Sequence, residues 1–418
     1  MLETIAKQAR AASKTLARTS SEKKNECIAK IAELLDANQK AVLEANAKDI
    51  AAAKANGMAE NLVDRLMLSQ ARLNGIAADL RSVVNLPDPI GETFDVFDHP
   101  NGLKMHKQRV PLGVIAVIYE ARPNVTMDVA SLTLKTGNAV ILRGGKETIH
   151  SNLALVNIIQ LGLKESGLPA ESVQFIDNPD RKLVSELLKM YEWIDMLIPR
   201  GGAGLHKYCR ENSSIPVITG GIGICHLYAD ASAKFDQSVA IVQNAKVQRP
   251  SVCNALDTLL VHQAIAAEFL PAVIKRLSQN GVTFRAAPDA MQYLSDADPA
   301  VVLPAEKDDF DTEWLSLVLG LKVVDTLDEA IDFIDEHSTH HSDGILTDTE
   351  ANANQFLAQM DSAAVYVNAS TRFTDGSQFG LGAEVAISTQ RLHARGPMAL
   401  KELTTYKWVI LGEYHVRP

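Results

Sequence analysis

Hydrophobic positions along the chain follow one spacing up to about residue 84 and a different one from residue 111 onward. In the first part, apolar residues recur at helical spacing in a background of Ala, Lys and Glu, with one stripe formed by Ile28, Ile31, Leu34 and Leu35. The Ser-Ser-Glu-Lys stretch at 20–23 provides a cap just before this stripe. We therefore expect the first part of the chain to be helical throughout.

From residue 111 onward, short apolar runs alternate with amphipathic segments. Strands are predicted at 113–119, 139–143, 173–176, 194–199 and 224–228, with helices at 127–134, 153–163, 181–190 and 204–211. The alternation continues with strands at 256–261, 301–303, 319–324, 343–346 and 364–368, and helices at 235–247, 264–280, 327–337 and 350–359. Such alternation predicts an α/β protein with parallel sheets covered on both faces.

Two further extended runs, at 93–98 and 103–110, are separated by a tetrapeptide that ends in Asn101-Gly102. Asn-Gly between extended runs is a strong hairpin signal. The second run is mostly polar and does not suit a core, so we expect an arm that meets another subunit. The strand-like run at 404–411 needs a partner, and the hairpin is the candidate.

Composition narrows the class of protein. The chain has 418 residues, 46% hydrophobic and 22% charged, with a net charge of -10, which is typical of a soluble protein of two or three domains. This charge, without a basic block, argues against nucleic acid or an anionic membrane as the main partner. No signal-peptide core or bilayer-spanning apolar run is present. We expect a cytoplasmic location, where thiols stay reduced.

The four cysteines are far apart and form no CxxC pair. Cys253 follows Pro250, which ends the preceding helix, and a side chain just after such a break can be presented as a nucleophile. A small buried hydrophobe accounts for Cys253 equally well at this stage. The other three are predicted to pack inside helices or strands: Cys27, Cys209 and Cys225. No metal site is expected, because the histidines at 337–341 lack completing ligands and suit a solvated helix end.

Two predicted strands run into glycines. The strand at 139–143 leads into a double glycine and Lys146, and the strand at 194–199 leads into Gly201 and Gly202 before a helix. Glycines let the backbone approach a ligand closely, and helix N-termini bind anions. A tight turn between packed elements explains each one alone. Two such turns at strand ends of one region favour a nucleotide site.

Asn124 also stands at the end of a predicted strand, within the segment 119–126. An Asn amide at this position can donate a hydrogen bond to an oxyanion. From spacing alone, however, a cap of the helix expected to begin near Thr126 accounts for Asn124 better. Both roles stay open at this point.

Six segments together resemble the gamma-glutamyl phosphate reductase family of the aldehyde dehydrogenase superfamily: 119–126, 141–147, 198–204, 248–254, 366–376 and 379–384. The resemblance runs over essentially the whole chain. It implies an aldehyde-dehydrogenase-like α/β fold with two parallel-sheet domains and a β-hairpin oligomerisation arm. On this plan the NADP-binding domain comprises 1–92 and 111–229, the arm comprises 93–110 and 404–418, and the catalytic domain comprises 230–403.

The resemblance implies NADPH-dependent reduction of L-glutamyl 5-phosphate to L-glutamate 5-semialdehyde and phosphate, the second step of proline biosynthesis from glutamate. It also implies a homo-oligomer, with glutamate 5-kinase as a candidate partner. Two alternatives stay open. One is another thioester-forming enzyme of the superfamily that uses a different acyl phosphate or an acyl-CoA, and the other is a non-catalytic nucleotide-binding protein.

Carried over by position, the resemblance makes Cys253 the nucleophile and Asn124 the oxyanion donor. Arg143 and Lys146 fall where the superfamily contacts the adenosine ribose. A cation at Lys146, where NAD-preferring relatives often have a carboxylate, suits the 2′-phosphate of NADPH. Glu313 falls near the glutamate that holds the nicotinamide ribose in the superfamily.

The substrate implied by the resemblance carries a phosphate and an α-carboxylate, so fixed cations are expected. Arg122, Arg249 and Arg372 each lie in a matched segment and are the candidates, with surface ion pairing as the alternative for each. Ile218 stands where hydrolytic aldehyde dehydrogenases carry a glutamate that activates water. Because an apolar side chain cannot take a proton from water, we expect the thioester to be reduced and not hydrolysed.

Overall fold

The computed structural model describes residues 1–417, apart from the side chain of Asn61, and divides into two compact units. Unit 1 contains Met1–Thr219, Gly380–Ala386 and the chain from Met398 onward, and unit 2 contains Gly220–Phe379 and Ile387–Pro397. The first boundary between the two units lies at 219/220, earlier than the expected domain boundary at 229/230. The reason is that β7 (Cys225–Ala229) pairs within the sheet of unit 2. No helix of the described residues is long and apolar enough to cross a membrane.

The first part of unit 1 is helical, as predicted. Its helices are α1 (Leu2–Leu16), α2 (Ser21–Ala37), α3 (Gln39–Ala55), α4 (Glu60–Leu66) and α5 (Gln70–Asn85). The predicted cap is confirmed, because the Ser20 side chain accepts a hydrogen bond from the Lys23 N–H at 3.3 Å. Ile28, Ile31 and Leu35 are buried, and α2 packs against α5 and α7 (Ile149–Glu165).

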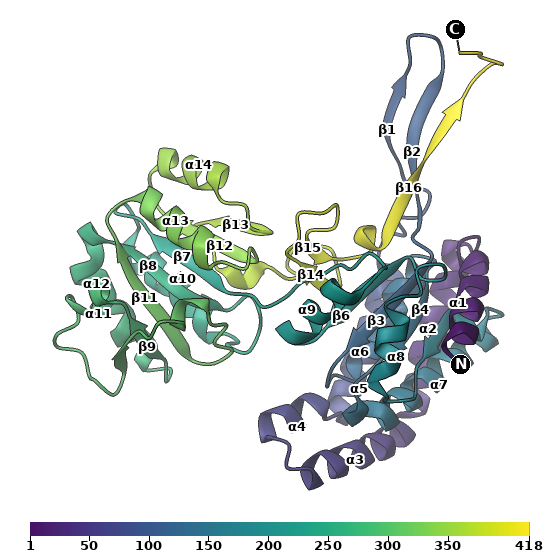
Figure 1. The fold of residues 1–418 in the computed structure, drawn as a ribbon, viewed down its shortest axis with the longest axis horizontal. Coiled ribbons are helices and arrows are strands. Elements are labelled where there is room, and N and C mark those ends of the chain that lie inside the picture. The colour runs from purple at the N-terminus through teal and green to yellow at the C-terminus, as the bar shows by residue number, and fades with distance from the viewer. Residues whose placement is uncertain (418) are drawn as a thin grey trace. The chain divides into compact units, whose positions relative to one another are not determined.

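The sheet of unit 1 has four parallel strands. Their order is β5 (Val173–Phe175), β4 (Ala139–Arg143), β3 (Val114–Tyr119) and β6 (Met196–Arg200). The connections contain α6 (Asn124–Lys135), α7 and α8 (Arg181–Leu187), and α9 (Ala203–Asn212) follows β6 (Figure 1). Strand β3 is buried along its whole length, which explains its uninterrupted apolar sequence. Because β4, β3 and β6 are neighbours, the turns at their carboxyl ends lie at one edge of the sheet.

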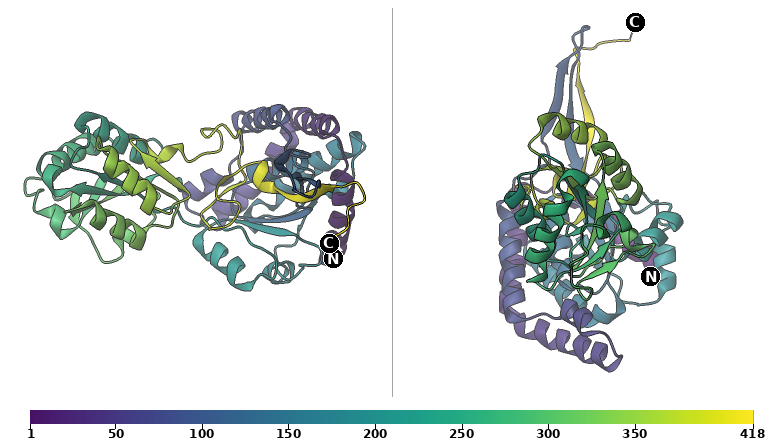
Figure 2. Two further views of the ribbon diagram at one scale, coloured as in Figure 1. Left: turned by 90° about the horizontal axis from the view of Figure 1, so that it is seen from above. Right: turned by 90° about the vertical axis from the view of Figure 1, so that its left-hand side faces the viewer.

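A three-stranded antiparallel sheet projects from the rest of unit 1 (Figures 1 and 2). It consists of β1 (Thr93–Asp98), β2 (Lys104–Pro111) and β16 (Thr404–Leu411), with β2 in the middle. The predicted hairpin and its pairing with the terminal strand are both confirmed. Lys107 Nζ lies 4.5 Å and 5.0 Å from the ring centroids of Tyr406 and Trp408, two exposed aromatic residues. A role for this arm in assembly stays a prediction.

Unit 2 contains a seven-stranded parallel sheet. Its order is β10 (Val302–Pro304), β9 (Thr283–Ala286), β11 (Val318–Val324), β8 (Leu256–His262), β7, β12 (Ser342–Leu346) and β13 (Ala364–Val367). One face packs on α10 (Phe235–Val247) and α11 (Gln263–Ser278), and the other on α13 (Leu327–His337) and α14 (Glu350–Gln359). Leu259 and Leu260 show this division, because the first belongs to one core cluster and the second to the other.

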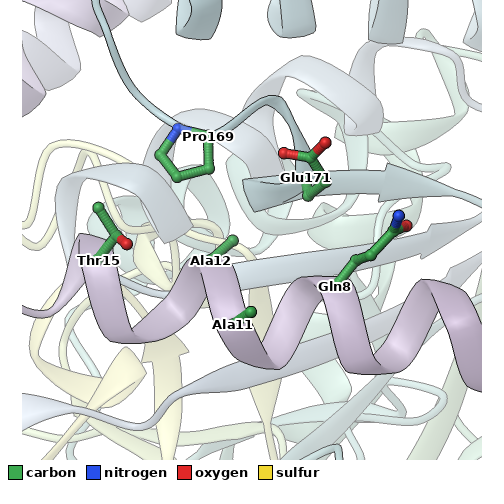
Figure 3. Close-up of a pocket in the computed structure, with 6 residues that line it drawn as sticks. All are labelled: Gln8, Ala11, Ala12, Thr15, Pro169 and Glu171. Atoms are coloured by element: carbon green, nitrogen blue, oxygen red, sulfur yellow. The ribbon is translucent and has the colours of Figure 1, made fainter.

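A surface hollow in unit 1 lies between α1 and the segment 169–171 (Figure 3). It is lined by Gln8, Ala11, Ala12, Thr15, Pro169 and Glu171. None of these residues was predicted to take part in a site, and two of the six are alanines without a functional group. The predicted chemistry lies elsewhere, at the edges of the two sheets.

Candidate active site

The turns after β3, β4 and β6 are tied together by two glutamates of unit 1. Glu147, in the turn after β4, accepts a hydrogen bond from the Ala121 N–H at 3.2 Å. Glu120, at the end of β3, accepts one from the Gly202 N–H at 3.0 Å. Ala121 itself has a φ of 40°, in the left-handed region that few non-glycine residues adopt. The structure therefore brings the two glycine turns and the Asn124 segment to one edge of the sheet.

Gly201 and Gly202 begin the turn into α9. A Cβ atom on Gly201 would collide with the Glu120 carboxylate, whereas one on Gly202 would meet open space. The carboxylate on the Gly202 N–H shows that the start of α9 accepts an anionic oxygen, as the N-terminal end of a helix dipole favours. A phosphate group of a dinucleotide is a chemically similar ligand for the same donor.

Lys146 and Arg143 differ in whether their cationic groups already make hydrogen bonds within the protein. The Lys146 side chain is exposed and makes no hydrogen bond or ion pair with the described residues. Arg143 donates from Nη1 to the Gly144 carbonyl at 3.0 Å and from Nη2 to the Pro179 carbonyl at 2.9 Å. Burial lowers the pKa of Arg143, and the neighbouring charge of Arg181 lowers it further. Arg143 thus holds the loop before α8, and Lys146 is the cation left for a ligand.

Asn124 does not cap α6. The helix begins at Asn124 itself, its N-cap residue is Pro123, and no side chain bonds to the backbone there. Asn124 Nδ2 instead donates to Asp128 Oδ2 at 2.9 Å, one turn along the helix. The capping interpretation is therefore wrong. An amide nitrogen carries two N–H donors, so the bond to Asp128 leaves the second for another acceptor.

Cys253 lies in the turn between α10 and β8, and both elements begin and end within a residue of their predicted positions. It is partly exposed, whereas the other three cysteines of the described chain are buried. Burial raises the pKa of Cys27 and of Cys209 to about 11. It raises the pKa of Cys225 well above the ordinary value. Cys253 is thus the cysteine that a substrate can reach.

Three neighbours in unit 2 hold the backbone around Cys253. The Cys225 thiol donates to the Cys253 carbonyl at 3.3 Å, and a Cβ atom on Gly223 would overlap that carbonyl. The Gly223 N–H donates to Glu313 Oε1 at 2.9 Å, so Glu313 contacts the same segment that packs on Cys253. Gly223 was not predicted from the sequence to be a site residue, and Cys225 was predicted only to pack in the interior. The cluster of glycines at 220–223 was the available signal, because glycines permit such close approach.

Arg372 and Arg249 also lie in unit 2, and their bonding differs. Arg372 donates from Nε to Gln248 Oε1 at 3.1 Å and from Nη1 to Asn254 Oδ1, the residue that follows Cys253. Burial lowers the pKa of Arg372, and the charge of Arg249 lowers it further. Arg249 makes no hydrogen bond or ion pair with the described residues. Arg122 lies in unit 1, in the turn between β3 and α6.

Asn254 fixes the turn that carries Cys253 to the 371–374 segment. Its Nδ2 atom donates to the Thr374 carbonyl at 2.9 Å, and its own carbonyl accepts from Thr371 Oγ1 at 2.7 Å. The side chain of Asn254 is buried, so breaking these bonds would leave polar groups unpaired in the interior. The turn that carries Cys253 is therefore fixed on both sides, by Cys225 and Gly223 before it and by the 371–374 segment after it.

The histidine-rich stretch at 337–341 was predicted from the sequence to be a solvated helix end. The structure does not agree with this prediction. His341 is buried and directly precedes strand β12, with Nδ1 2.9 Å from Ser342 Oγ and 4.0 Å from Cys225 Sγ. His337 does end α13, and pairs with Asp311 at 2.8 Å. Within residues 1–417 no group of three or more His, Cys, Asp or Glu side chains is arranged to hold a metal ion.

Comparison with known proteins agrees with this architecture. The aldehyde dehydrogenase family model matches residues 1–290. The chain is 58% identical over 417 residues to a gamma-glutamyl phosphate reductase of Serratia marcescens, and the match covers all of both chains. The crystal structure of a gamma-glutamyl phosphate reductase from Thermotoga maritima superimposes with a TM-score of 0.97 at 47% identity, over 100% of each chain.

More distant structures share the fold. An engineered glycolyl-CoA reductase with bound NADP+ has a TM-score of 0.69 at 17% identity, covering 98% of this chain and 96% of its own. The expected aldehyde-dehydrogenase-like fold is thus confirmed. At 58% identity over the full length, the likeness is far closer than the shared fold alone requires. The chain belongs to the aldehyde dehydrogenase family and, within it, to the gamma-glutamyl phosphate reductases.

Proposed function

We propose that the protein reduces L-glutamyl 5-phosphate with NADPH to L-glutamate 5-semialdehyde and phosphate, through a thioester on Cys253. The observation that carries the proposal is the setting of Cys253. It is the accessible cysteine of the chain, its turn is clamped on both sides, and Arg249 lies nearby with no partner among the described residues. The full-length likeness to gamma-glutamyl phosphate reductases supports the choice of substrate.

The chemistry begins with attack of the Cys253 thiolate on the acyl carbon of the substrate. A C–S bond forms, the bond from carbon to the phosphate oxygen breaks, and phosphate leaves with the electron pair. The oxyanion of the tetrahedral intermediate accepts hydrogen bonds from the Asn124 amide and the Cys253 N–H. Ile218, buried and apolar, offers no base to activate water, so the thioester persists until it is reduced.

Reduction of the thioester requires a hydride, which NADPH supplies to the thioester carbon when it is bound. The resulting thiohemiacetal loses the Cys253 thiolate as its C–S bond breaks, and the aldehyde is released. In this scheme unit 1 is the cofactor domain, with Lys146 on the 2′-phosphate and the Gly202 N–H on the pyrophosphate. Glu313 of unit 2 would hold the nicotinamide ribose. The carboxylate already on the Gly202 N–H supports the fit of an anionic ligand there.

The substrate anions are assigned to arginines whose bonding differs. Arg249 has donors to spare and is assigned to the substrate. Arg372 already donates from Nε to Gln248 and from Nη1 to Asn254, so its role is to hold the turn in place and to add positive charge to it. Arg122, exposed beside Asn124, is the third candidate. We further propose a homo-oligomer formed through the β1–β2–β16 arm, a cytoplasmic location, and glutamate 5-kinase as the source of substrate.

The test is the reverse reaction, in which the full-length enzyme reduces NADP with glutamate 5-semialdehyde as the donor. Turnover should require inorganic phosphate, and coenzyme A should not replace it. Cys253→Ala should be inactive, whereas Cys27→Ala, which alters a buried thiol with no assigned role in the reaction, should be active. Turnover with coenzyme A but not phosphate would instead identify an acyl-CoA reductase. Absence of turnover with either acceptor would favour a non-catalytic nucleotide-binding protein.

A further inference from the structure

Asn124 and Asp128 form a pair within one helix. They stand four residues apart on α6, hence on the same face, and Asn124 Nδ2 donates to Asp128 Oδ2 at 2.9 Å. An ionised carboxylate can only accept hydrogen bonds, so the end of the amide that faces it must be the nitrogen. The pair therefore fixes which way the Asn124 amide is turned.

We propose that Asp128 is a positioning residue for the reaction: it holds the Asn124 amide with its nitrogen in place and its second N–H available to the oxyanion. The inference rests on the proposed function, in which Asn124 donates to that oxyanion. A terminal amide otherwise has two orientations of similar energy, related by a half turn. In the wrong one a carbonyl oxygen would face the developing negative charge and repel it.

The surroundings of Asp128 favour this role over an ordinary structural one. Among the described residues Asp128 forms no ion pair, and its carboxylate has the Asn124 amide as its hydrogen-bond donor. A partly buried carboxylate without an ion-pair partner costs folding free energy. Such a group is not explained by stability, so its removal should affect turnover more than the melting temperature.

The charge of Asp128 is set by its neighbours. Burial raises the pKa of Asp128 to about 6, and the carboxylate of Asp79 on α5 raises it as well. The Asn124 amide and the guanidinium of Arg200 on β6 act in the opposite direction. Near pH 6 the carboxyl therefore takes up a proton and gains an O–H donor. Once protonated it can bond to either end of the amide, so the orientation of Asn124 is no longer enforced.

The experiment compares Asp128→Ala, Asp128→Asn, Asn124→Ala and the double variant Asn124→Ala/Asp128→Ala in the full-length enzyme. Removing one oxyanion donor costs about a hundredfold or more in kcat, which sets the ceiling for an effect that acts through Asn124. We expect Asp128→Ala to lower kcat by roughly fivefold to fiftyfold, below that ceiling, with KM for NADP and the melting temperature nearly unchanged. The double variant should match Asn124→Ala alone, because Asp128 has no role once the amide is gone.

The pH profile separates positioning from packing. Wild-type kcat should fall as the pH drops through about 6, where Asp128 is protonated. Asp128→Asn keeps the shape of the side chain and is the variant to use if Asp128→Ala does not fold. Asp128→Asn should have a reduced kcat and should lose the acid limb of the pH profile, which is the fall in kcat as the pH drops. Asp79→Asn is the matched control, since it removes the repulsion that raises the pKa of Asp128. Its kcat at neutral pH should be unchanged and its acid limb should shift to lower pH.

Two results would overturn the proposal. One is an Asp128→Asn variant whose kcat equals that of the wild type and still falls at low pH. The other is a double variant whose fold-decrease in kcat equals the product of the fold-decreases of the two single variants. Failure of the proposed function looks different. In that case Asn124→Ala would leave kcat unchanged, whatever the Asp128 variants do.

Discussion

The buried thiol of Cys225 donates a hydrogen bond to the backbone carbonyl of Cys253, 28 residues away in sequence, at 3.3 Å. Burial holds the pKa of Cys225 far above neutral, so the thiol keeps the proton that it donates. One cysteine thus supports the backbone of the other. Sequence alone gave no reason to separate Cys225 from Cys27 and Cys209, because contact with the turn arises only when β7 and β8 pair.

Replacing Cys225 should therefore affect turnover, in contrast to the other buried cysteines. We expect Cys225→Ala to lower kcat by about twofold to tenfold, the scale of one modest hydrogen bond. Cys225→Ser keeps a donor and should retain most of the activity, and Cys209→Ala serves as the control. The measurements are kcat and the rate at which iodoacetamide modifies Cys253. Equal kcat for Cys225→Ala and Cys209→Ala would show that the contact is packing alone.

Loss of Cys253 should abolish the reaction without affecting the cofactor. In the proposed mechanism the thiolate forms the covalent intermediate, whereas the residues assigned to NADPH lie mainly in unit 1. We expect no turnover from Cys253→Ala and an unchanged dissociation constant for NADPH, measured by fluorescence titration. A variant that retained more than a trace of activity would remove Cys253 from the chemistry.

Lys146→Glu should change the cofactor preference. The substitution removes the cation that we propose binds the 2′-phosphate and puts a negative group in its place. A charge-assisted hydrogen bond contributes about 1–3 kcal/mol, so NADPH binding should weaken by roughly tenfold to a hundredfold, with NADH much less affected. The measurement is kcat/KM for both cofactors. Parallel losses for NADPH and NADH would mean that Lys146 holds the loop or the pyrophosphate.

The two arginines of unit 2 should give different kinetic defects. Arg249→Gln should raise KM for phosphate in the reverse reaction by roughly tenfold to a hundredfold, because a charge-assisted bond to the anion is lost. Arg372→Lys should instead lower kcat and the melting temperature. Lysine cannot reproduce the fork that bonds both Gln248 and Asn254. If the two variants showed the same pattern, the division of roles between Arg249 and Arg372 would be wrong.

A buried ion pair in unit 1 predicts how stability depends on pH. Lys24 Nζ lies 2.5 Å from Asp88 Oδ2, and the side chains are 2% and 7% exposed. Burial acts to raise the pKa of Asp88, but bonds from Lys24, Ser21 and the Ile90 N–H outweigh it and leave the pKa below its usual value. A carboxyl with a lowered folded pKa stabilises the protein fully above its unfolded pKa. That contribution is lost as the pH falls through the folded value.

Asp88→Asn should therefore lower the free energy of unfolding by about 3–5 kcal/mol at pH 7, since it leaves a buried lysine without its carboxylate. The difference from wild type should shrink as the pH falls below about 4, where Asp88 itself becomes protonated in the unfolded chain. Urea unfolding at several pH values is the measurement. Glu3→Gln, which breaks an exposed pair with Lys7, is the control and should change stability little. A pH-independent difference for Asp88→Asn would contradict the assignment.

Most of the architecture could be predicted from the sequence, because its signals are local. The helices at 235–247, 327–337 and 350–359 have the predicted bounds, since the apolar spacing that predicts them is a local signal. Strand β9 (Thr283–Ala286) was missed because four residues are too short for an alternation to stand out. The division between the two units at 219/220 was not predictable, because the pairing of β7 with β8 depends on residues far along the chain.

The candidate site was predictable to the extent that its residues stand next to breaks in the chain. Cys253 follows a helix-stopping proline, and Gly201 and Gly202 follow a strand. The hydrogen bonds of Arg143 and Arg372 were not predictable. The sequence does not distinguish an arginine that already donates to carbonyl or amide oxygens from one whose donors are available to a ligand. The pairing of Asn124 with Asp128 had a local signal, a four-residue spacing on one helix.

The arm sheet has a consequence for the order in which the protein can fold during synthesis. Its central strand β2 is paired on one side by β1, which immediately precedes it, but on the other by β16, which is synthesised long after β2. Until then one edge of β2 has unpaired backbone groups, and such edges invite association with other chains. The polar sequence of β2 gives that edge little apolar surface while it waits. A nascent or truncated chain without β16 should thus be the form most in need of chaperones.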